Sequence, residues 1–178
     1  MERISTRLDG PVALAPKVHA DSRGFFVETF RAEEWERHGV SVEWVQDNHS
    51  RSRRGTLRGM HFQPGQAKLV RCARGAIFDA IVDIRPGSDT FGQWEGWVLD
   101  DSEMLALYVP DGFAHGFCVL SDEADVVYKC STYYDPLTEA GFAQDDPAVG
   151  IEWPSDLERI VSERDQAAPR LEALVAAR

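Results

Sequence analysis

The sequence has little positive charge, few cysteines and no long apolar run. Its 19 lysine and arginine residues face 30 aspartates and glutamates, a net charge of −11 that argues against general binding to nucleic acids or anionic membranes. Three widely spaced cysteines, Cys72, Cys118 and Cys130, form no CxxC pair, so we expect buried free thiols. No stretch is long enough to span a bilayer and no signal peptide is visible, so we expect a cytoplasmic protein.

Repeats, linkers and glycine-rich phosphate loops are also missing. Without a composition break, the 178 residues are interpreted as one domain spanning 1–178. Neither GxxxxGK[ST] nor GxGxxG occurs, so a bound phosphate would be held by side chains rather than by a helix N-terminus. This favours a nucleotide-linked small molecule over ATP turnover.

The centre of the chain has the alternation of β-strands. In "GAIFDAIVDIRPG" apolar and polar positions alternate until Pro86 and Gly87, and further short runs follow in "GQWEGWVLD", "MLALYVPDG", "HGFCVL" and "DVVYKCSTYY". Helical patterns are confined to 31–39 and to the C-terminus at about 169–178. We therefore predict a mainly β antiparallel barrel or jelly roll with a few short peripheral helices. Its expected core or wall aromatics are Trp44, Trp94, Trp97, Phe113 and Phe117.

A basic window interrupts this acidic chain. Seven of the 19 lysines and arginines lie between Arg51 and Arg74, and these 24 residues contain no aspartate or glutamate. Guanidinium groups suit phosphate oxygens, so the window predicts an anion site. In a regular strand over 56–63, Arg58 and His61 would point to opposite faces. For both to serve one site the strand must bend, bulge or begin after Arg58, and Gly55 and Gly59 are the residues that would permit it.

Two motifs raise the question of a metal. "VPDGFAHGF" contains Pro110, Gly112 and His115 in the PxGxxH arrangement, which resembles the second motif of the cupin barrels. The first cupin motif normally offers HxH followed by a glutamate, but here His61 is followed by Gln63 and then by Lys68. A lysine in place of a carboxylate works against a divalent cation, so we expect a cupin-like barrel without metal or other cofactor.

Chemistry without a metal would begin with His61 as a neutral base. A carboxylate on its second ring nitrogen would fix the tautomer, Lys68 would stabilise an enolate, and a tyrosine on the other side of the substrate would return a proton. The segments "VVYKCSTYY" and "VSERDQAAP" offer tyrosines and a carboxylate. No spacing rule selects Tyr128 or Asp165 among them, and strand parity separates Tyr128 from Tyr133 unless the strand ends between them.

The ordered motifs identify the family. The segments "APKVHADSRGFFVETF", "VQDNHSRS", "GTLRGMHFQ", "KLVRCARG", "VPDGFAHGF", "YKCSTYYDP" and "VSERDQAAP" resemble those of the dTDP-4-dehydrorhamnose 3,5-epimerases, metal-independent cupin-fold enzymes. This resemblance implies that His61 is the proton acceptor, Asp165 its dyad partner, Tyr128 the proton donor and Lys68 a neighbour of the C4 oxygen. The implied substrate contacts are Arg23, Glu28, Gln46, Asp47, Asn48, Arg58, His115, Tyr133, Glu139 and Arg164.

The same resemblance implies a homodimer whose segment at about 1–50 contacts the partner, and a dTDP-linked 4-keto-6-deoxy sugar as ligand. Two residues depart from the family pattern: Ala67 replaces a glycine before Lys68, and Arg164 replaces a lysine before Asp165. Ala67 would shift Lys68 if the backbone there needed a positive φ.

Three alternatives to 3,5-epimerisation remain open at this point. The first is an epimerase that inverts one carbon only, or that acts on another dTDP-linked 4-keto-6-deoxy sugar, in antibiotic or surface-glycan synthesis. The others are a metal-dependent cupin and a sugar-nucleotide-binding module without turnover.

Overall fold

Two antiparallel sheets form the body of the molecule. The structure is a computed structural model, and it describes residues 1–176. The first sheet has the order β1 (Glu2–Ile4), β2 (Val12–Ala15), β10 (Ala106–Val109), β7 (Lys68–Arg74), β12 (Glu123–Cys130) and β5 (Gln46–Arg53). The second has the order β13 (Ala140–Gly141), β6 (Thr56–Phe62), β11 (Phe113–Val119), β8 (Ala76–Asp83) and β9 (Trp94–Asp100), and β14 (Ile160–Val161) pairs with β6 in parallel.

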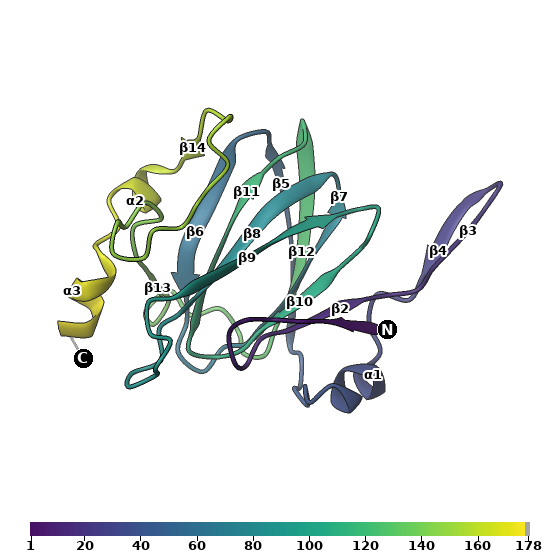
Figure 1. Cartoon of the computed structure of the whole chain (residues 1–178), viewed down its shortest axis with the longest axis horizontal. Helices are drawn as coiled ribbons and strands as arrows, with labels where there is room; N and C mark the ends of the chain where they lie inside the picture. The colour runs from purple at the N-terminus through teal and green to yellow at the C-terminus, as the bar shows by residue number, and fades with distance from the viewer. Residues whose placement is uncertain (177–178) are drawn as a thin grey trace.

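The main core lies between these sheets. Because strand residues alternate between faces, each sheet sends every second side chain inward. Val70, Leu107 and Val126 of the first sheet meet Ile77 and Ile81 of the second in one buried cluster. This is the predicted jelly-roll barrel of the cupin type, and Figure 1 shows its two layers.

Each outer face is covered by a different part of the chain. On the first sheet, α1 (Ala32–Arg37) buries Trp35 against Leu14 and Leu69. On the second, the segment after β13 packs Phe142 and Trp153 beside β6 and β8. The helices α2 (Glu163–Gln166) and α3 (Leu171–Ala176) follow, beside β6 at the left of Figure 1. The C-terminal segment thus returns to the strand that carries His61.

Most sequence predictions of secondary structure are confirmed. All five predicted central runs are strands, the three cysteines are free and buried, and Phe113 and Phe117 are in the core. Trp44, Trp94 and Trp97 are only half-buried, at the edges of the clusters. Both helices are shorter than expected, and the last two residues of the predicted C-terminal helix lie outside the described residues. No helix within residues 1–176 is long and apolar enough to cross a bilayer.

One element stands apart from the barrel. Strands β3 (Val18–Asp21) and β4 (Gly24–Val27) form a separate two-stranded hairpin, which projects from the body at the upper right of Figure 1. Phe25 and Phe26 of this hairpin are 60% and 71% exposed. Two such aromatic rings on an isolated hairpin leave a large apolar surface in water.

Candidate active site

A histidine and a carboxylate meet at the inner side of β6. Nε2 of His61 lies 2.7 Å from Oδ1 of Asp165, which is in α2 and only 6% exposed. Ser162 caps α2 by accepting a hydrogen bond from the Asp165 amide, and the Gly59 amide donates to Oδ2 of Asp165. His61 and Gly59 thus hold the carboxylate, and Ser162 holds the backbone of the same residue. With Nε2–H donated to Asp165, Nδ1 of His61 is left as the ring nitrogen that can take a proton.

Asp165 is held in its charged form. Burial by itself would raise its pKa, but the hydrogen bond and charge of His61, with further hydrogen bonds from Gly59 and Ser162, bring the pKa below the ordinary aspartate value. An ionised Asp165 stabilises a protonated His61. The pair therefore has the arrangement of a general base with its orienting carboxylate.

The predicted bend in β6 is present. Gly59 has φ +125°, and the pairing of β6 with β11 shifts register at this point. Arg58 and His61 consequently line the same cavity instead of opposite faces. A side chain at position 59 would meet the backbone of Gly116 at 2.6 Å, so this close strand contact requires glycine.

A second histidine–aspartate pair lies beside the first. Nε2 of His115 in β11 is 2.7 Å from Oδ2 of Asp79 in β8, and both residues are buried. Oδ1 of Asp79 is also buried and has no hydrogen-bond partner in the described part of the chain. Asp79 was not among the residues predicted from the sequence. Its available signal was an aspartate on the same strand face as Ile77 and Ile81, a position at which burial penalises a carboxylate unless it is paired.

Lys68 and Tyr128 complete the reactive set, from neighbouring strands β7 and β12. Burial lowers the pKa of Lys68, partly opposed by Cys130, Glu139 and Asp79, and its ammonium has no hydrogen bond or ion pair within residues 1–174. Burial raises the pKa of Tyr128, so its phenol stays protonated. Strand β12 ends at Cys130, between Tyr128 and Tyr133, which removes the parity conflict between the two tyrosines.

These groups surround one cavity of about 470 Å³. It contains all four predicted catalytic residues and three of the predicted substrate contacts, Arg58, His115 and Arg164. The lining residues are Ser50, Thr56, Leu57, Arg58, His61, Lys68, His115, Phe117, Tyr128, Ile160, Val161, Ser162, Arg164 and Asp165. Cations and hydrogen-bond donors dominate, so the cavity suits an anionic, oxygen-rich ligand.

The other predicted contacts lie around this cavity or away from it. Glu139 pairs with Arg164 at its rim, while Tyr133 is 72% exposed in the loop after β12. Gln46, Asp47 and Asn48 begin β5, where Gln46 donates to Asn48 and Asp47 pairs with Lys129. Arg23 and Glu28 belong to the projecting hairpin region and pair there with Asp21 and Arg31. Within one chain the structure does not bring these last two residues to the cavity.

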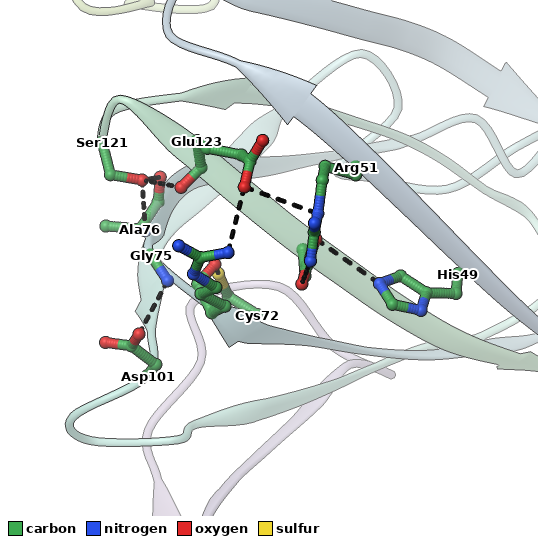
Figure 2. Close-up of polar contacts among 10 residues, drawn as sticks. His49, Arg51, Cys72, Gly75, Ala76, Asp101, Ser121 and Glu123 are labelled. Atoms are coloured by element: carbon green, nitrogen blue, oxygen red, sulfur yellow. Dashed lines mark hydrogen bonds and ion pairs between the residues drawn. The ribbon is translucent and has the colours of Figure 1, made fainter.

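The basic window divides into groups with different tasks. Arg51 and Arg74 do not serve an anion site, because both pair with Glu123 and Arg51 also pairs with Asp125. Figure 2 shows Arg51 beside Glu123. These carboxylates come from β12, far along the sequence, so an acid-free window was not an acid-free surface. Only Arg58 and Lys68 of the seven cations line the cavity.

The two departures from the family pattern are accommodated. Ala67 does not have a positive φ; its amide and carbonyl exchange hydrogen bonds with Ser131, which fixes the backbone next to Lys68. Arg164 has the same positive charge as the lysine it replaces, and its ion pair with Glu139 holds it at the rim. Among residues 1–174, no three histidine, cysteine or acidic side chains form a group that could hold a metal.

Comparison with known proteins gives a consistent result. The family model described as dTDP-4-dehydrorhamnose 3,5-epimerase matches residues 5–173. The chain is 48% identical to the dTDP-4-dehydrorhamnose 3,5-epimerase of Methanothermobacter thermautotrophicus, over 92% of this chain and 90% of that protein. It is 44% identical to a dTDP-4-dehydrorhamnose 3-epimerase of Streptomyces niveus, over 90% of this chain and 79% of that protein.

A solved structure agrees with these relatives. The dTDP-6-deoxy-D-glucose-3,5-epimerase of Legionella pneumophila, in complex with dTDP-4-keto-L-rhamnose, superimposes with a TM-score of 0.95 at 44% identity. The match covers 99% of this chain and 95% of that one. Fold, motifs and the geometry of the cavity thus lead to one conclusion: the chain belongs to the family of the dTDP-4-dehydrorhamnose 3,5-epimerases.

Proposed function

We propose that this chain is an isomerase that inverts C3 and C5 of dTDP-4-dehydro-6-deoxy-D-glucose and yields dTDP-4-dehydro-L-rhamnose. The observation that carries the proposal is the convergence of the His61–Asp165 pair, the unpaired Lys68 and the phenol of Tyr128 on one cavity. Both carbons neighbour the C4 ketone, and a proton leaves such a carbon when a base is near and the resulting enolate oxygen is stabilised.

His61 takes the proton and Asp165 supports it. Nδ1 of His61 removes the hydrogen from the sugar carbon, and the imidazolium that forms is stabilised by the ionised carboxylate 2.7 Å from Nε2. His61 is more accessible than His115: its side chain is 28% exposed, against 9% for His115. We therefore assign the proton transfer to His61 and a supporting contact with the ligand to His115.

Lys68 supplies the charge for the enolate. An ammonium without a counter-ion in a buried site is costly, and the cost is recovered when a negative oxygen arrives. The C4 oxygen becomes negative as the C–H electrons move into the enolate. Lys68 then stabilises this intermediate more than the starting ketone, which is the requirement for lowering the barrier.

Tyr128 returns a proton from the other side of the sugar. Burial keeps this phenol protonated, and its position on β12, across the barrel from β6, lets it act on the face opposite His61. Removal of a proton from one face and its return to the other changes the configuration of the carbon. His61 then releases its proton to solvent and Tyr128 takes one up, and repetition at the second carbon gives the doubly inverted product.

Arg58 is assigned to the diphosphate. Its Nε donates to Ser52, and it has no carboxylate partner within residues 1–174, so its guanidinium group is available for phosphate oxygens. Tyr133, Glu139 and Arg164 are assigned to the nucleotide and sugar around the rim. Gln46, Asp47 and Asn48, at the start of β5, are assigned to the same ligand, and the last two also line the neighbouring concavity on the outer face of the first sheet. The Legionella enzyme, solved in complex with dTDP-4-keto-L-rhamnose, supports this ligand class.

Arg23 and Glu28 are assigned to the site of a second copy, in a homodimer. A two-stranded hairpin alone is only marginally stable in water, and Phe25 and Phe26 are exposed on it. A concavity of about 320 Å³ on the outer face of the first sheet, lined by Phe30, Arg71 and Lys129 among others, offers a second unfilled surface. Mutual burial would cover both surfaces.

Three unpaired cysteines further support a cytoplasmic location.

The test is incubation with the 4-keto substrate in deuterated water, followed by NMR of the product. We expect deuterium and inversion at both C3 and C5. Inversion with label at one carbon only would favour a monoepimerase such as the Streptomyces niveus relative. Stoichiometric metal together with loss of activity on chelation would favour a metal cupin, and nucleotide binding without any exchange would favour a binding module.

A further inference from the structure

The loop after β12 carries two exposed aromatic rings on an unusually well-bonded backbone. Tyr133 and Tyr134 are 72% and 53% exposed, so burial of these rings cannot hold the loop in place. The loop nevertheless links the two reactive strands, since it begins next to Cys130 of β12 and leads to β13, which pairs with His61 of β6. What holds it therefore decides where the two tyrosines lie.

Glutamine side chains hold the loop, and Gln63 makes the most contacts with it. Nε2 of Gln63 donates to the Thr132 hydroxyl at 3.2 Å and to the Tyr133 carbonyl at 3.0 Å, and its Oε1 accepts from the Asp135 amide at 2.9 Å. Gln63 is 6% exposed. Both donors and the acceptor of this amide are thus spent on one loop, on either side of Tyr133.

Gln66 and Gln46 extend the same set. Nε2 of Gln66, a residue only 8% exposed, donates to the carbonyl and the hydroxyl of Thr132 at 3.1 and 3.3 Å. Oε1 of Gln46 accepts from the Tyr134 amide at 2.9 Å. With the Ser131–Ala67 bonds already described, every residue from 131 to 135 is fixed by at least one hydrogen bond to 46 or to 63–67.

Such a network costs free energy unless each buried polar group in it is hydrogen-bonded. Burying two glutamine side chains requires all their polar groups to be satisfied, and an apolar contact would stabilise a surface loop with fewer constraints. Gln63 also stands at the position of the second histidine of the cupin HxH motif. Its amide is aimed at the loop, so this position now serves the loop backbone.

We propose that Gln63 and Gln66 are positioning residues of the substrate site, whose amides clamp residues 131–135 and thereby hold Tyr133 where it contacts the nucleotide sugar. The inference rests on the proposed function, in which Tyr133 contacts the substrate. Neither glutamine touches the reacting atoms. Their effect on turnover must therefore pass through Tyr133.

A double-mutant cycle tests this dependence. Gln63→Glu keeps the size and the acceptor for Asp135 but removes both donors and sets a carboxylate against the Tyr133 carbonyl. We expect KM for the 4-keto sugar to rise about tenfold, a coupling of ordinary size for contacting residues, with kcat changed less than about threefold. In a Tyr133→Ala background the same substitution should change KM less than about threefold. An equal change in both backgrounds, or none in the first, would overturn the proposal.

Hydrogen–deuterium exchange gives a second readout that does not need turnover. Thr132→Val removes the hydroxyl that both glutamines address, whereas Thr132→Ser keeps it. Faster amide exchange within 131–139 in the valine variant, with wild-type exchange in the serine variant and in the barrel strands, is the expected result. Unchanged exchange in the valine variant would overturn the clamp even if Gln63→Glu failed to fold. A wild-type chain without epimerase activity would instead refute the proposed function, while the exchange data would still decide the clamp.

Discussion

Two histidines with almost the same partner geometry have different surroundings in this cavity. His61 and His115 each lie 2.7 Å from an aspartate oxygen, yet the His61 side chain is 28% exposed and the other only 9%. Asp165 receives hydrogen bonds from Gly59 as well, whereas Asp79 retains a buried oxygen without a partner. A base must both reach its substrate and remain oriented, and only the His61–Asp165 pair has the access and the complete support for it.

Lys68 makes the pH dependence of the reaction predictable in sign. Because burial lowers its pKa, the ammonium loses its proton as pH rises through a value below that of an ordinary lysine. Loss of the charge removes enolate stabilisation, so kcat should fall along this alkaline limb. Lys68→Arg should reduce kcat but remove the limb, because a guanidinium group stays charged throughout. A pH–rate profile in which both proteins keep the same limb would contradict the assignment.

Tyr128 separates exchange from inversion. In Tyr128→Phe, His61 and Lys68 still form the enolate, so deuterium should enter the sugar from solvent. The inverted product should form at least about 10²-fold more slowly, which is the usual size of the effect when a general acid is lost. NMR of label and configuration in the same sample checks both quantities. Tyr133→Phe is the matched control. A wild-type yield of product from Tyr128→Phe would exclude Tyr128 as the proton donor.

Residue identities in this site could be predicted only in part. The chemistry of a lone histidine in a basic window indicated a base, but His61 and Asp165 are 104 positions apart, and only family resemblance selected Asp165. Asp79 was missed because its partner His115 lies on another strand. Conversely, Arg51 and Arg74 looked free in the sequence, since the carboxylates that neutralise them are on β12.

At the scale of elements, the bend of β6 is the feature on which the site depends. Gly59→Ala would place a methyl group 2.6 Å from Gly116 and hold an alanine at a φ of +125°. The steric clash and the backbone strain both destabilise the fold. We expect the free energy of unfolding to fall by about 2–5 kcal/mol, measured by urea denaturation. Gly39→Ala also has a positive φ, +88°, but no atom within 4 Å, and should lose only about 1 kcal/mol. Equal losses would show that the close approach of β6 to β11 is unimportant.

The hairpin of β3 and β4 is the element that the proposed homodimer would use. Phe26→Asp replaces the most exposed ring of the hairpin with a charge. It should weaken the proposed dimer at least about tenfold, measured by sedimentation equilibrium. Leu137→Asp, at a 92% exposed position in the loop after β12, is the control and should leave the association unchanged. A Phe26→Asp protein that associates as tightly as wild type would exclude the hairpin from the interface.

Elements were easier to predict than their arrangement. Alternation of apolar residues marked β8 to β12 because half-buried strands require it. Parity predicted an irregularity in β6, at Gly55 or Gly59, if Arg58 and His61 serve one site, and the structure has it at Gly59. The parallel pairing of β14 with β6, which returns Asp165 to His61, could not be predicted, because a two-residue strand has no periodicity.

On the scale of the whole molecule, the barrel separates a supporting core from a reactive lining. Apolar side chains fill the space between the sheets, and the polar set of His61, Lys68, Tyr128, His115 and Arg58 gathers at one cavity. The net charge of −11 repels anions in general, so the local cations must attract the nucleotide sugar. Local chemistry rather than overall charge therefore determines what the protein binds.

The central claim is that one base, His61, serves both carbons. The most direct test compares wild type with His61→Asn in deuterated water, with dTDP affinity measured by calorimetry on the same samples. Deuterium should enter C3 and C5 with the wild-type protein and neither carbon with the variant, while dTDP binding changes less than about threefold. Deuterium entering either carbon at the wild-type rate in His61→Asn would contradict the account.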